Sequence, residues 1–429
     1  MKHNFIRLIY SLLIIITLLF STLNFGIREN GYVTIIFFGI GLLSLSAAFF
    51  SSNKRYSLNK VFWIFNYIFF FLAPVYQFKN NIVFHFKGFI EDETYIVGGI
   101  LILIALILYF FSYNLFFNKI KNNESFELEK YYKFTPLIIA SFFSSLIFLY
   151  LIKFDLSVLV YRQLGVDFKP KVLYGNLGYA VISIIRYVPF FSLLLYILSD
   201  KIKKQQFLIL LFLTLFLTFP TSLSRGIVAG MYLPLLLFLF PVFKNKINFI
   251  LLFLVSVLLF FPLANSFRNI KNQGFSFNYE LFSSQQFDAF QNFILLVKEN
   301  IITNGSQLVD SFLFFNGKGV CSGQILGERI GYNFYNVAMP YIGEGFINFG
   351  YFGIVFFIIF LALFNAFLDK KQHYLNLSFK SIYLVLIGFQ FYILRGDLSS
   401  SIKKMTGFIF ALLIVVFTSY IFKKLNKKA

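Results

Sequence analysis

Long apolar runs separated by short polar connections form the dominant pattern of this chain. A helix needs about 20 apolar residues to cross the roughly 30 Å hydrocarbon core of a bilayer. By this criterion the sequence offers about twelve spans. They lie near residues 5–21, 32–50, 61–77, 94–116, 134–152, 177–198, 207–222, 227–243, 248–265, 341–368, 381–394 and 405–422. The pattern predicts an all-α polytopic membrane protein.

One polar interruption is much longer than the others. It extends over Ser266–Pro340 and ends in MPYIGEGFINFGYFG, which leads directly into the next apolar run. A chain that only crossed the bilayer would not need such a segment, so we expect chemistry there. The chain then divides into nine helices with short loops over 1–265, this large loop over 266–340, and three helices with a basic tail over 341–429.

Residues 281–298 of the large loop have the spacing of an amphipathic helix. Apolar side chains recur every three or four residues, and polar side chains occupy the opposite face. The apolar positions are Phe287, Phe290, Ile294 and Val297. Two placements remain open, because such a helix can lie on the outer membrane surface or pack against other segments of the loops.

The composition excludes a soluble protein. Hydrophobic residues make up 59% of the 429 residues and charged residues 13%, more apolar surface than a soluble domain can bury. The net charge of +20 does not indicate nucleic acid, because the basic residues lie mostly in short loops, where they orient membrane proteins. The single cysteine, Cys321, excludes an internal disulfide and a cysteine metal site. No phosphate-binding loop or dinucleotide fingerprint supports nucleotide chemistry.

The distribution of basic residues sets the expected orientation. Lys2 and Arg7 precede the first apolar run, as in a signal peptide, but no small-residue cleavage site follows, so we interpret this run as an uncleaved span. With the N-terminus inside, Lys and Arg moderately favour the inner loops, both termini are cytoplasmic, and the large loop faces outward. The connection Pro220–Gly226 is short enough to be a re-entrant turn instead.

Arginine is the recurring polar residue near the outer side. Its guanidinium stays charged and has a planar fork that suits phosphate oxygens, so several arginines around one cavity would bind a diphosphate. The candidates are Arg162, Arg186, Arg225, Arg268, Arg329 and Arg395. Arg186 lies inside the apolar run AVISIIRYVPFF, where a charge is costly; function, snorkelling and pairing with a buried carboxylate are its three explanations. For the loop arginines, a solvated or headgroup-bound charge is the alternative.

Two carboxylates at outer helix ends are candidates for a general base. Glu344 in IGEGF and Asp397 in RGD can be partly desolvated there, which would raise the pKa of each toward a useful range. For Asp397 the alternative is a local pair with Arg395. Glycines 343, 345, 350 and 353 flank Glu344 and permit close approach of a helix or a ligand.

Histidine is informative through its scarcity. His3 and His373 fall on the inner side, and His85 lies in the second outward loop. The large loop contains none, so neither a histidine base nor a histidine metal cluster is expected there.

The order of motifs resembles the Wzy-type O-antigen or capsule repeat-unit polymerases. The motifs are SRGIVAGMYLPLL, then FRN at the start of the large loop, QLVDSFLFFNGKG, YIGEGFINFGYFGI and finally LRGDLSS. The resemblance implies a GT-C-like glycosyltransferase of the bacterial inner membrane. On the periplasmic side it would move a growing glycan from undecaprenyl diphosphate onto the next lipid-linked repeat unit. A chain-length regulator is a further candidate partner.

Arginines of the third and fifth periplasmic loops are regarded as functional in that family, in Arg-x10-Gly or Arg-x15-Gly patterns. Arg329 and Gly345 fit the longer spacing, whereas Arg162 departs from the shorter one, since Leu173 stands where the glycine belongs. A diphosphate-linked sugar is already activated, so arginines that stabilise the leaving group suffice and no cofactor or metal is expected. Glu344 is the first choice for accepting the proton of the acceptor hydroxyl.

Two other functions remain as alternatives. A lipid-linked oligosaccharide flippase has a similar length and number of spans, but should have mostly short loops and charges around a central cavity. Relatives of the O-antigen ligase use a histidine in the large periplasmic loop, which is absent here.

Overall fold

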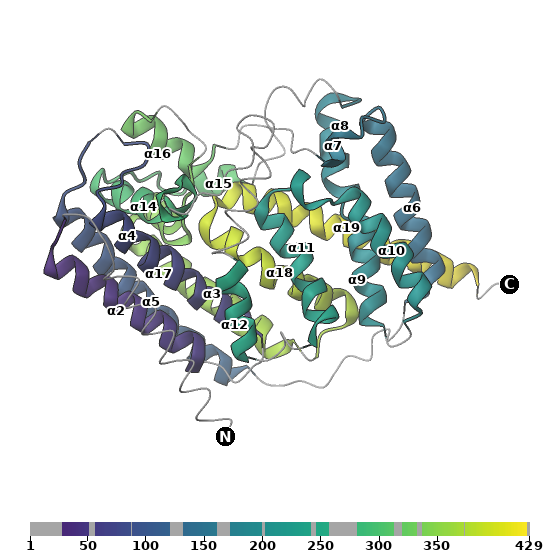
Figure 1. Cartoon of the computed structure of the whole chain (residues 1–429), viewed down its shortest axis with the longest axis horizontal. Coiled ribbons are helices and arrows are strands. Elements are labelled where there is room, and N and C mark those ends of the chain that lie inside the picture. The colour runs from purple at the N-terminus through teal and green to yellow at the C-terminus, as the bar shows by residue number, and fades with distance from the viewer. Residues whose placement is uncertain are drawn as a thin grey trace.

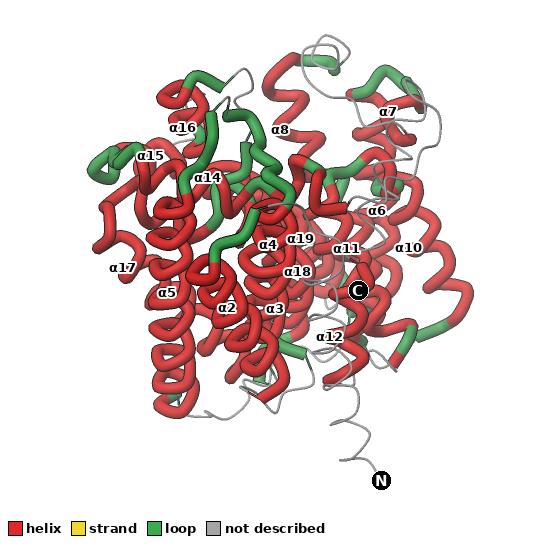
Figure 2. Tube along the Cα trace, turned by 60° about the vertical axis from the view of Figure 1, so that its left-hand side comes forward, coloured by secondary structure: helices red, strands yellow, loops and turns green. Residues whose placement is uncertain are grey.

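Helices are the only regular elements in the part of the chain that the structure describes (Figures 1 and 2). The structure is a computed structural model. It describes residues 28–50, 56–86, 88–120, 132–160, 172–199, 202–241, 246–256, 281–312, 320–332, 337–372 and 374–426.

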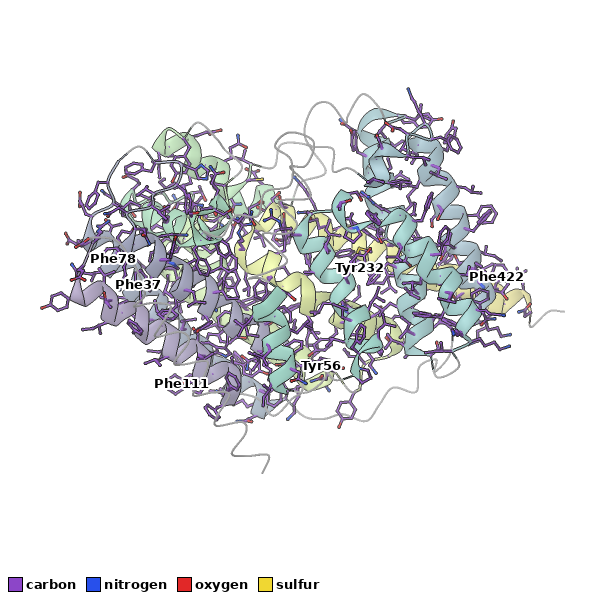
Figure 3. The ribbon with its side chains drawn as sticks, viewed as in Figure 1. Phe37, Tyr56, Phe78, Phe111, Tyr232 and Phe422 are labelled. Carbon is purple, nitrogen blue, oxygen red and sulfur yellow. The ribbon has the colours of Figure 1, made fainter. Side chains whose placement is uncertain are left out.

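Nine helical stretches of the described residues are long and apolar enough to cross a membrane. They are α2 (Gly31–Phe50), α3 to α4 (Leu58–Lys79), α5 (Asp92–Lys119), α6 (Phe134–Leu151), α8 and α9 (Gly175–Leu198), α10 with the turn after it (Lys204–Ser222), α17 (Tyr341–Lys371), α18 (Leu377–Arg395) and α19 (Leu398–Leu425). Large apolar side chains are exposed on these helices, as expected for a surface that faces lipid. Phe111 of α5, at the edge of the molecule in Figure 3, is 65% exposed. The prediction of a helical, multi-span membrane protein is confirmed in this form.

Of the other three predicted spans, one lies outside the described residues and two are described as shorter helices. The first, near 5–21, lies outside the described residues. The span near 227–243 corresponds to α11 (Arg225–Leu239), whose 15 residues reach only about 22 Å. The span near 248–265 is represented by α12 (Lys246–Val255), and this stretch of described residues ends at 256. Twelve spans therefore stay a prediction.

The loops expected outside meet at one end of the described helices, which we call the loop end. Lys298 of the large loop lies 3.5 Å from Glu91, which precedes α5. At the opposite end, Asp369 of α17 accepts hydrogen bonds from the amides of Leu58 and Asn59, which start α3. Successive described spans thus alternate in direction as the sequence predicts. The short helices α14 (Ala289–Lys298), α15 (Ser306–Phe312) and α16 (Ser322–Ile330) all belong to the loop end (Figure 2).

Helix α14 is buried on nearly every side, although it belongs to a polar loop. Phe290 packs edge-on against Phe37 of α2, with ring centroids 5.3 Å apart. Ile294 lies so close to Gly98 of α5 that a Cβ on this glycine would be 2.2 Å from its Cγ2. The interpretation as a helix on the membrane surface is therefore wrong. The helix is packed, as in the other placement, but against the membrane-spanning helices α2 and α5 as well as against loop segments. Its polar residue Gln291 accepts a hydrogen bond from the amide of Phe84, 2.9 Å away.

Helix α17 is kinked after its second turn. Phe349 has φ −144° and ψ 24°, and Gly350 has φ 60° and ψ −146°, a conformation that only glycine adopts readily. The kink separates residues 341–348, called the short arm below, from the long membrane-spanning part. Gly345 and Gly353 touch across the kink, because a Cβ on Gly353 would lie 1.9 Å from the Gly345 carbonyl oxygen.

Side chains of the large loop and of the short arm fix the bend. The kink exposes the carbonyl of Ile347, which accepts hydrogen bonds from the amide and hydroxyl of Thr303 at 2.7 and 2.9 Å. Asn348 donates to the Gln307 side chain at 2.7 Å and to the Glu344 carbonyl at 2.9 Å. These contacts satisfy polar groups that the broken helix would otherwise leave unpaired.

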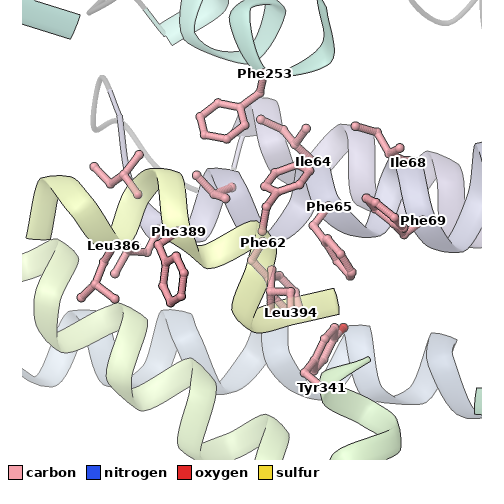
Figure 4. Packing of buried hydrophobic residues seen from close by; sticks show 14 of the residues in the cluster. Phe62, Ile64, Phe65, Ile68, Phe69, Phe253, Tyr341, Leu386, Phe389 and Leu394 are labelled. Atoms are coloured by element: carbon pink, nitrogen blue, oxygen red, sulfur yellow. The ribbon is translucent and has the colours of Figure 1, made fainter. Parts of the chain in front are cut away.

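A cluster of buried aromatic side chains packs against the start of the short arm. Tyr341, its first residue, donates a hydrogen bond to Asn66 of α3 at 2.8 Å and packs on Phe62 and Phe65 (Figure 4). Phe391 of α18 reaches the same cluster through Phe65. The arm is thus anchored to α3, which packs in turn against α18, and this fixes the direction of the residues that the arm carries.

Candidate functional site

Three helices begin around the side chain of Glu344 at the loop end. Glu344 lies in the first turn of α17 and is 3% exposed. Its Oε1 accepts hydrogen bonds from the hydroxyl of Ser322, which starts α16, and from the amide of Leu398, which starts α19, 2.9 Å away. The first turn of a helix has unpaired N–H groups and a partial positive charge, so a carboxylate is favourable there.

The second oxygen of Glu344 is different. Oε2 is buried and has no hydrogen-bond partner among the described residues. Buried polar atoms are normally paired, so this oxygen is available to a ligand or a proton. A hydroxyl that reached it would be adjacent to the first turns of α16 and α19.

Asp397, the other predicted base, caps α19. Its Oδ1 accepts the amide of Ser400 at 2.8 Å, and its carboxylate also contacts the thiol of Cys321, the N-cap of α16. The alternative considered for Asp397, a local pair with Arg395, is not the arrangement observed. Arg395 ends α18 and points to Asp288, just before α14, with Nη2 3.4 Å from Oδ1. The two charged residues of the RGD motif thus belong to different helices and have different partners.

Asp288 also receives a histidine that the sequence placed elsewhere. His85 Nε2 lies 3.6 Å from Asp288 Oδ2, and both side chains are at most 5% exposed. The ring of Tyr332, which follows α16, packs 5.5 Å from the His85 ring. The large loop itself contains no histidine, yet a histidine side chain lies against it. His85 comes from the second outward loop, and only tertiary packing brings it there.

The other predicted arginines occupy three kinds of position. Arg225 is the first residue of α11, and the next residue, Gly226, lies against the ring of Tyr392. Tyr392 is one turn before Arg395 on α18, so Arg225 and Arg395 lie in the same region of the loop end. Arg329 is exposed in the last turn of α16, away from the Ser322 end that meets Glu344. Arg162 and Arg268 lie outside the described residues.

Arg186 has a partner that the sequence did not suggest. It lies where α8 gives way to α9, and its Nε donates to the carbonyl of Leu217 at the end of α10, 2.7 Å away. Its Nη2 donates to the hydroxyl of Ser222 at 2.5 Å. The guanidinium thus satisfies a carbonyl that a helix end leaves unpaired. This arrangement accounts for a charge inside an apolar span without a carboxylate.

Sequence reasoning missed Asp288, His85, Ser322 and Cys321, and it found Glu344. Ser399 and Ser401 in the first turn of α19 were also missed, and their buried hydroxyls have no hydrogen-bond partner among the described residues. Asp288 gave one signal in the sequence. It is the only acid within residues 281–298, and it directly precedes the first residue of α14.

The pKa of the Cys321 thiol is raised by its burial next to Asp397. Burial raises its pKa to about 11, and the charge and hydrogen bond of Asp397 add to this effect, whereas Lys403 opposes it. The thiol is therefore almost fully protonated near neutral pH, and a protonated thiol is a poor nucleophile.

We expect the Asp397→Asn variant to alkylate faster than the wild type. Loss of the carboxylate charge lowers the pKa of Cys321, so the thiolate fraction at pH 8 rises and the rate with a maleimide increases by about 3–10-fold. Asn still caps the helix. The mass of the intact protein, followed over time, measures the rate at the one cysteine of the chain. An unchanged or slower rate would show that Asp397 does not control this thiol.

The arrangement combines an unpartnered carboxylate oxygen, an arginine held by a buried acid, and hydroxyls in a helix first turn. Such a set can accept a proton and stabilise an anion. Within the described residues, no group of three or more His, Cys, Asp and Glu side chains has the geometry of a metal site. Comparison of the chain with family models, with curated proteins and with solved structures gave no match.

Proposed function

We propose that this protein is a glycosyltransferase that polymerises undecaprenyl-diphosphate-linked repeat units into O-antigen or capsular polysaccharide. It would work on the periplasmic side of the bacterial inner membrane, with twelve spans, GT-C-like architecture and cytoplasmic termini. The observation that carries the proposal is the buried Oε2 of Glu344, unpartnered among the described residues, at the loop end of a membrane-spanning helix. The resemblance of the surrounding motifs to the Wzy-type polymerases supports the same function.

The residues suit the chemistry of glycosyl transfer. The acceptor hydroxyl oxygen forms a bond to the anomeric carbon of the growing chain, and the bond from that carbon to the diphosphate breaks. The diphosphate leaves with the electron pair, and Arg395 and Arg225 are the described arginines best placed to stabilise it. The proton of the hydroxyl passes to Glu344. Arg162 and Arg268 remain candidates for the same diphosphate.

A ligase is the second candidate, and one observation favours it. The absence of a histidine from the large loop spoke against a ligase, but His85 lies against Asp288 of that loop. A ligase would use the same lipid-linked donor and a different acceptor. A flippase is less well supported, because the carboxylates and Arg395 gather at the loop end of the helices instead of along a central path.

Deletion of the gene distinguishes a polymerase from a flippase or a ligase. A strain without the polymerase should make surface lipid capped with a single repeat unit, because ligation continues without polymerisation. Loss of a flippase or a ligase should leave no repeat unit on the surface lipid. The glycan ladder on a gel measures this directly, and unchanged chain lengths in the deletion strain would contradict the proposed function.

A further inference from the structure

We propose that Asp288 is a positioning residue, which holds Arg395 in the orientation that binds the diphosphate of the lipid-linked substrate. This inference rests on the proposed function, because it needs an anionic ligand at Arg395. It adds to the site a residue of the large loop that contacts no reacting atom.

The geometry of Asp288 suits positioning better than catalysis. The carboxylate is buried, with 2% of the residue exposed. Its oxygens have different partners, Arg395 at 3.4 Å on Oδ1 and His85 at 3.6 Å on Oδ2. A carboxylate between two such groups has little freedom to rotate or to approach a substrate. Its orientation instead determines where the guanidinium lies.

Arg395 keeps donors for a ligand while one nitrogen faces Asp288. Its side chain is 29% exposed, and its Nε is buried without a hydrogen-bond partner among the described residues. A guanidinium carries five N–H groups, so the exposed part of the side chain still offers N–H groups to phosphate oxygens beside the contact with Asp288. Arg395 ends α18, and only Gly396 and Asp397 separate it from the first turn of α19. Two N–H groups at this helix start already donate to Glu344 and Asp397, so the guanidinium itself would bind the anion.

His85 completes the arrangement from a second loop. Its backbone is in the left-handed region, with φ 59°, which is uncommon for a residue other than glycine. Such a conformation persists only where the surroundings hold it. His85 lies 3.6 Å from the second oxygen of Asp288 and so limits the space in which that carboxylate can turn.

Positioning and simple electrostatics predict opposite results for Asp288→Asn. If only the net field mattered, removal of a negative charge next to Arg395 would tighten the binding of an anion. If Asp288 positions Arg395, the neutral amide holds the guanidinium less firmly, and binding weakens although the site becomes more positive. The sign of the change therefore distinguishes the two explanations.

The test measures binding of undecaprenyl diphosphate to the purified full-length chain in detergent by native mass spectrometry, with undecaprenyl monophosphate as the comparison ligand. We expect Asp288→Asn to weaken diphosphate binding about tenfold, as for loss of a charge-assisted contact, and to change monophosphate binding less. Asp92→Asn is the matched control, since it weakens the Arg28–Asp92 pair at the same end, outside the site. This control should bind like the wild type.

A double-mutant cycle separates positioning from a general loss of structure. In the Arg395→Gln background, Asp288→Asn should have no further effect on diphosphate binding, because its action passes through Arg395. Additive effects would overturn the inference, as would unchanged or tighter binding by Asp288→Asn alone. If Asp288→Asn does not accumulate, Arg395→Lys provides the test: it keeps the charge, loses the planar fork and should bind about tenfold more weakly. Wild-type affinity in that variant would overturn the inference.

The wild type separates this inference from the proposed function. A wild-type protein that binds the diphosphate lipid no better than the monophosphate lipid would contradict the proposed function, and this inference with it. Clear preference for the diphosphate in the wild type, together with unchanged binding in Asp288→Asn, would overturn the inference alone.

Discussion

Replacement of Glu344 by Gln should abolish polymerisation while the protein still accumulates in the membrane. The amide oxygen of Gln can accept the hydrogen bonds of Ser322 and Leu398, so the junction of the three helices is kept. An amide cannot take the proton of the acceptor hydroxyl, and loss of a general base lowers the rate by about 10²–10⁴-fold. Turnover of a lipid-linked repeat unit by the purified protein, and the glycan ladder of a complemented deletion strain, both measure the effect.

Asp369→Asn is the matched control for this variant. Asp369 is also a buried acid on α17, at the opposite end of the same helix. It accepts hydrogen bonds from the amides of Leu58 and Asn59 and from the hydroxyls of Tyr113 and Tyr383, at 2.8–3.1 Å. Its replacement should cost about 1–3 kcal/mol of stability, because an amide NH₂ faces a donor, but turnover per folded molecule should persist. Normal ladders from Glu344→Gln would show that Glu344 only joins the three helices.

A Gly353→Ala variant should lose most activity and become less stable. The added Cβ would lie 1.9 Å from the carbonyl oxygen of Gly345, a distance that no side-chain rotation relieves because the neighbour is backbone. The short arm must move away, and Glu344 moves with it. Overpacking of this kind costs about 1–3 kcal/mol, and a displacement of about 1 Å at a reacting group can lower the rate about 10²-fold. Thermal unfolding in detergent and the turnover assay measure the two effects separately.

Gly39→Ala tests whether the effect belongs to the kink. Gly39 lies in the middle of α2, and its added Cβ would meet Leu103 at 3.6 Å, an ordinary contact. This variant should unfold and turn over like the wild type, since the new methyl displaces nothing. If Gly353→Ala also behaved like the wild type, the close approach of Gly345 and Gly353 would not be what places Glu344.

The sequence allowed the spans and their alternation to be predicted because both follow from local hydropathy. A run of apolar residues is recognisable without knowledge of its neighbours, as for α5, and the basic loops set a direction. The kink in α17 was only suggested by its glycines. Nothing in the sequence shows that Gly345 faces Gly353, because that contact depends on the conformation of the two residues between which the helix breaks.

Contacts between loops were beyond prediction for a different reason. Asp288 and His85 are separated by about 200 residues, and their meeting depends on how α14 packs among the membrane-spanning helices. Proximity along the chain was misleading for the RGD motif. Arg395 and Asp397 are almost adjacent in sequence, yet they do not pair. The carboxylate of Asp397 accepts a hydrogen bond from an N–H group at the start of α19, and Arg395 contacts Asp288 instead.

The burial of α14 limits how substrates can enter. Six large apolar side chains of this helix are buried, namely Phe290, Phe293, Ile294, Leu295, Leu296 and Val297. Lifting the helix into water would expose all of them, at a cost of at least about 9 kcal/mol at 1.5 kcal/mol each. At equilibrium, fewer than about one molecule in a million would then be open in this way. Helix α14 itself therefore does not swing out, and under the proposed function a lipid-linked glycan should arrive sideways through the bilayer while α14 stays in place.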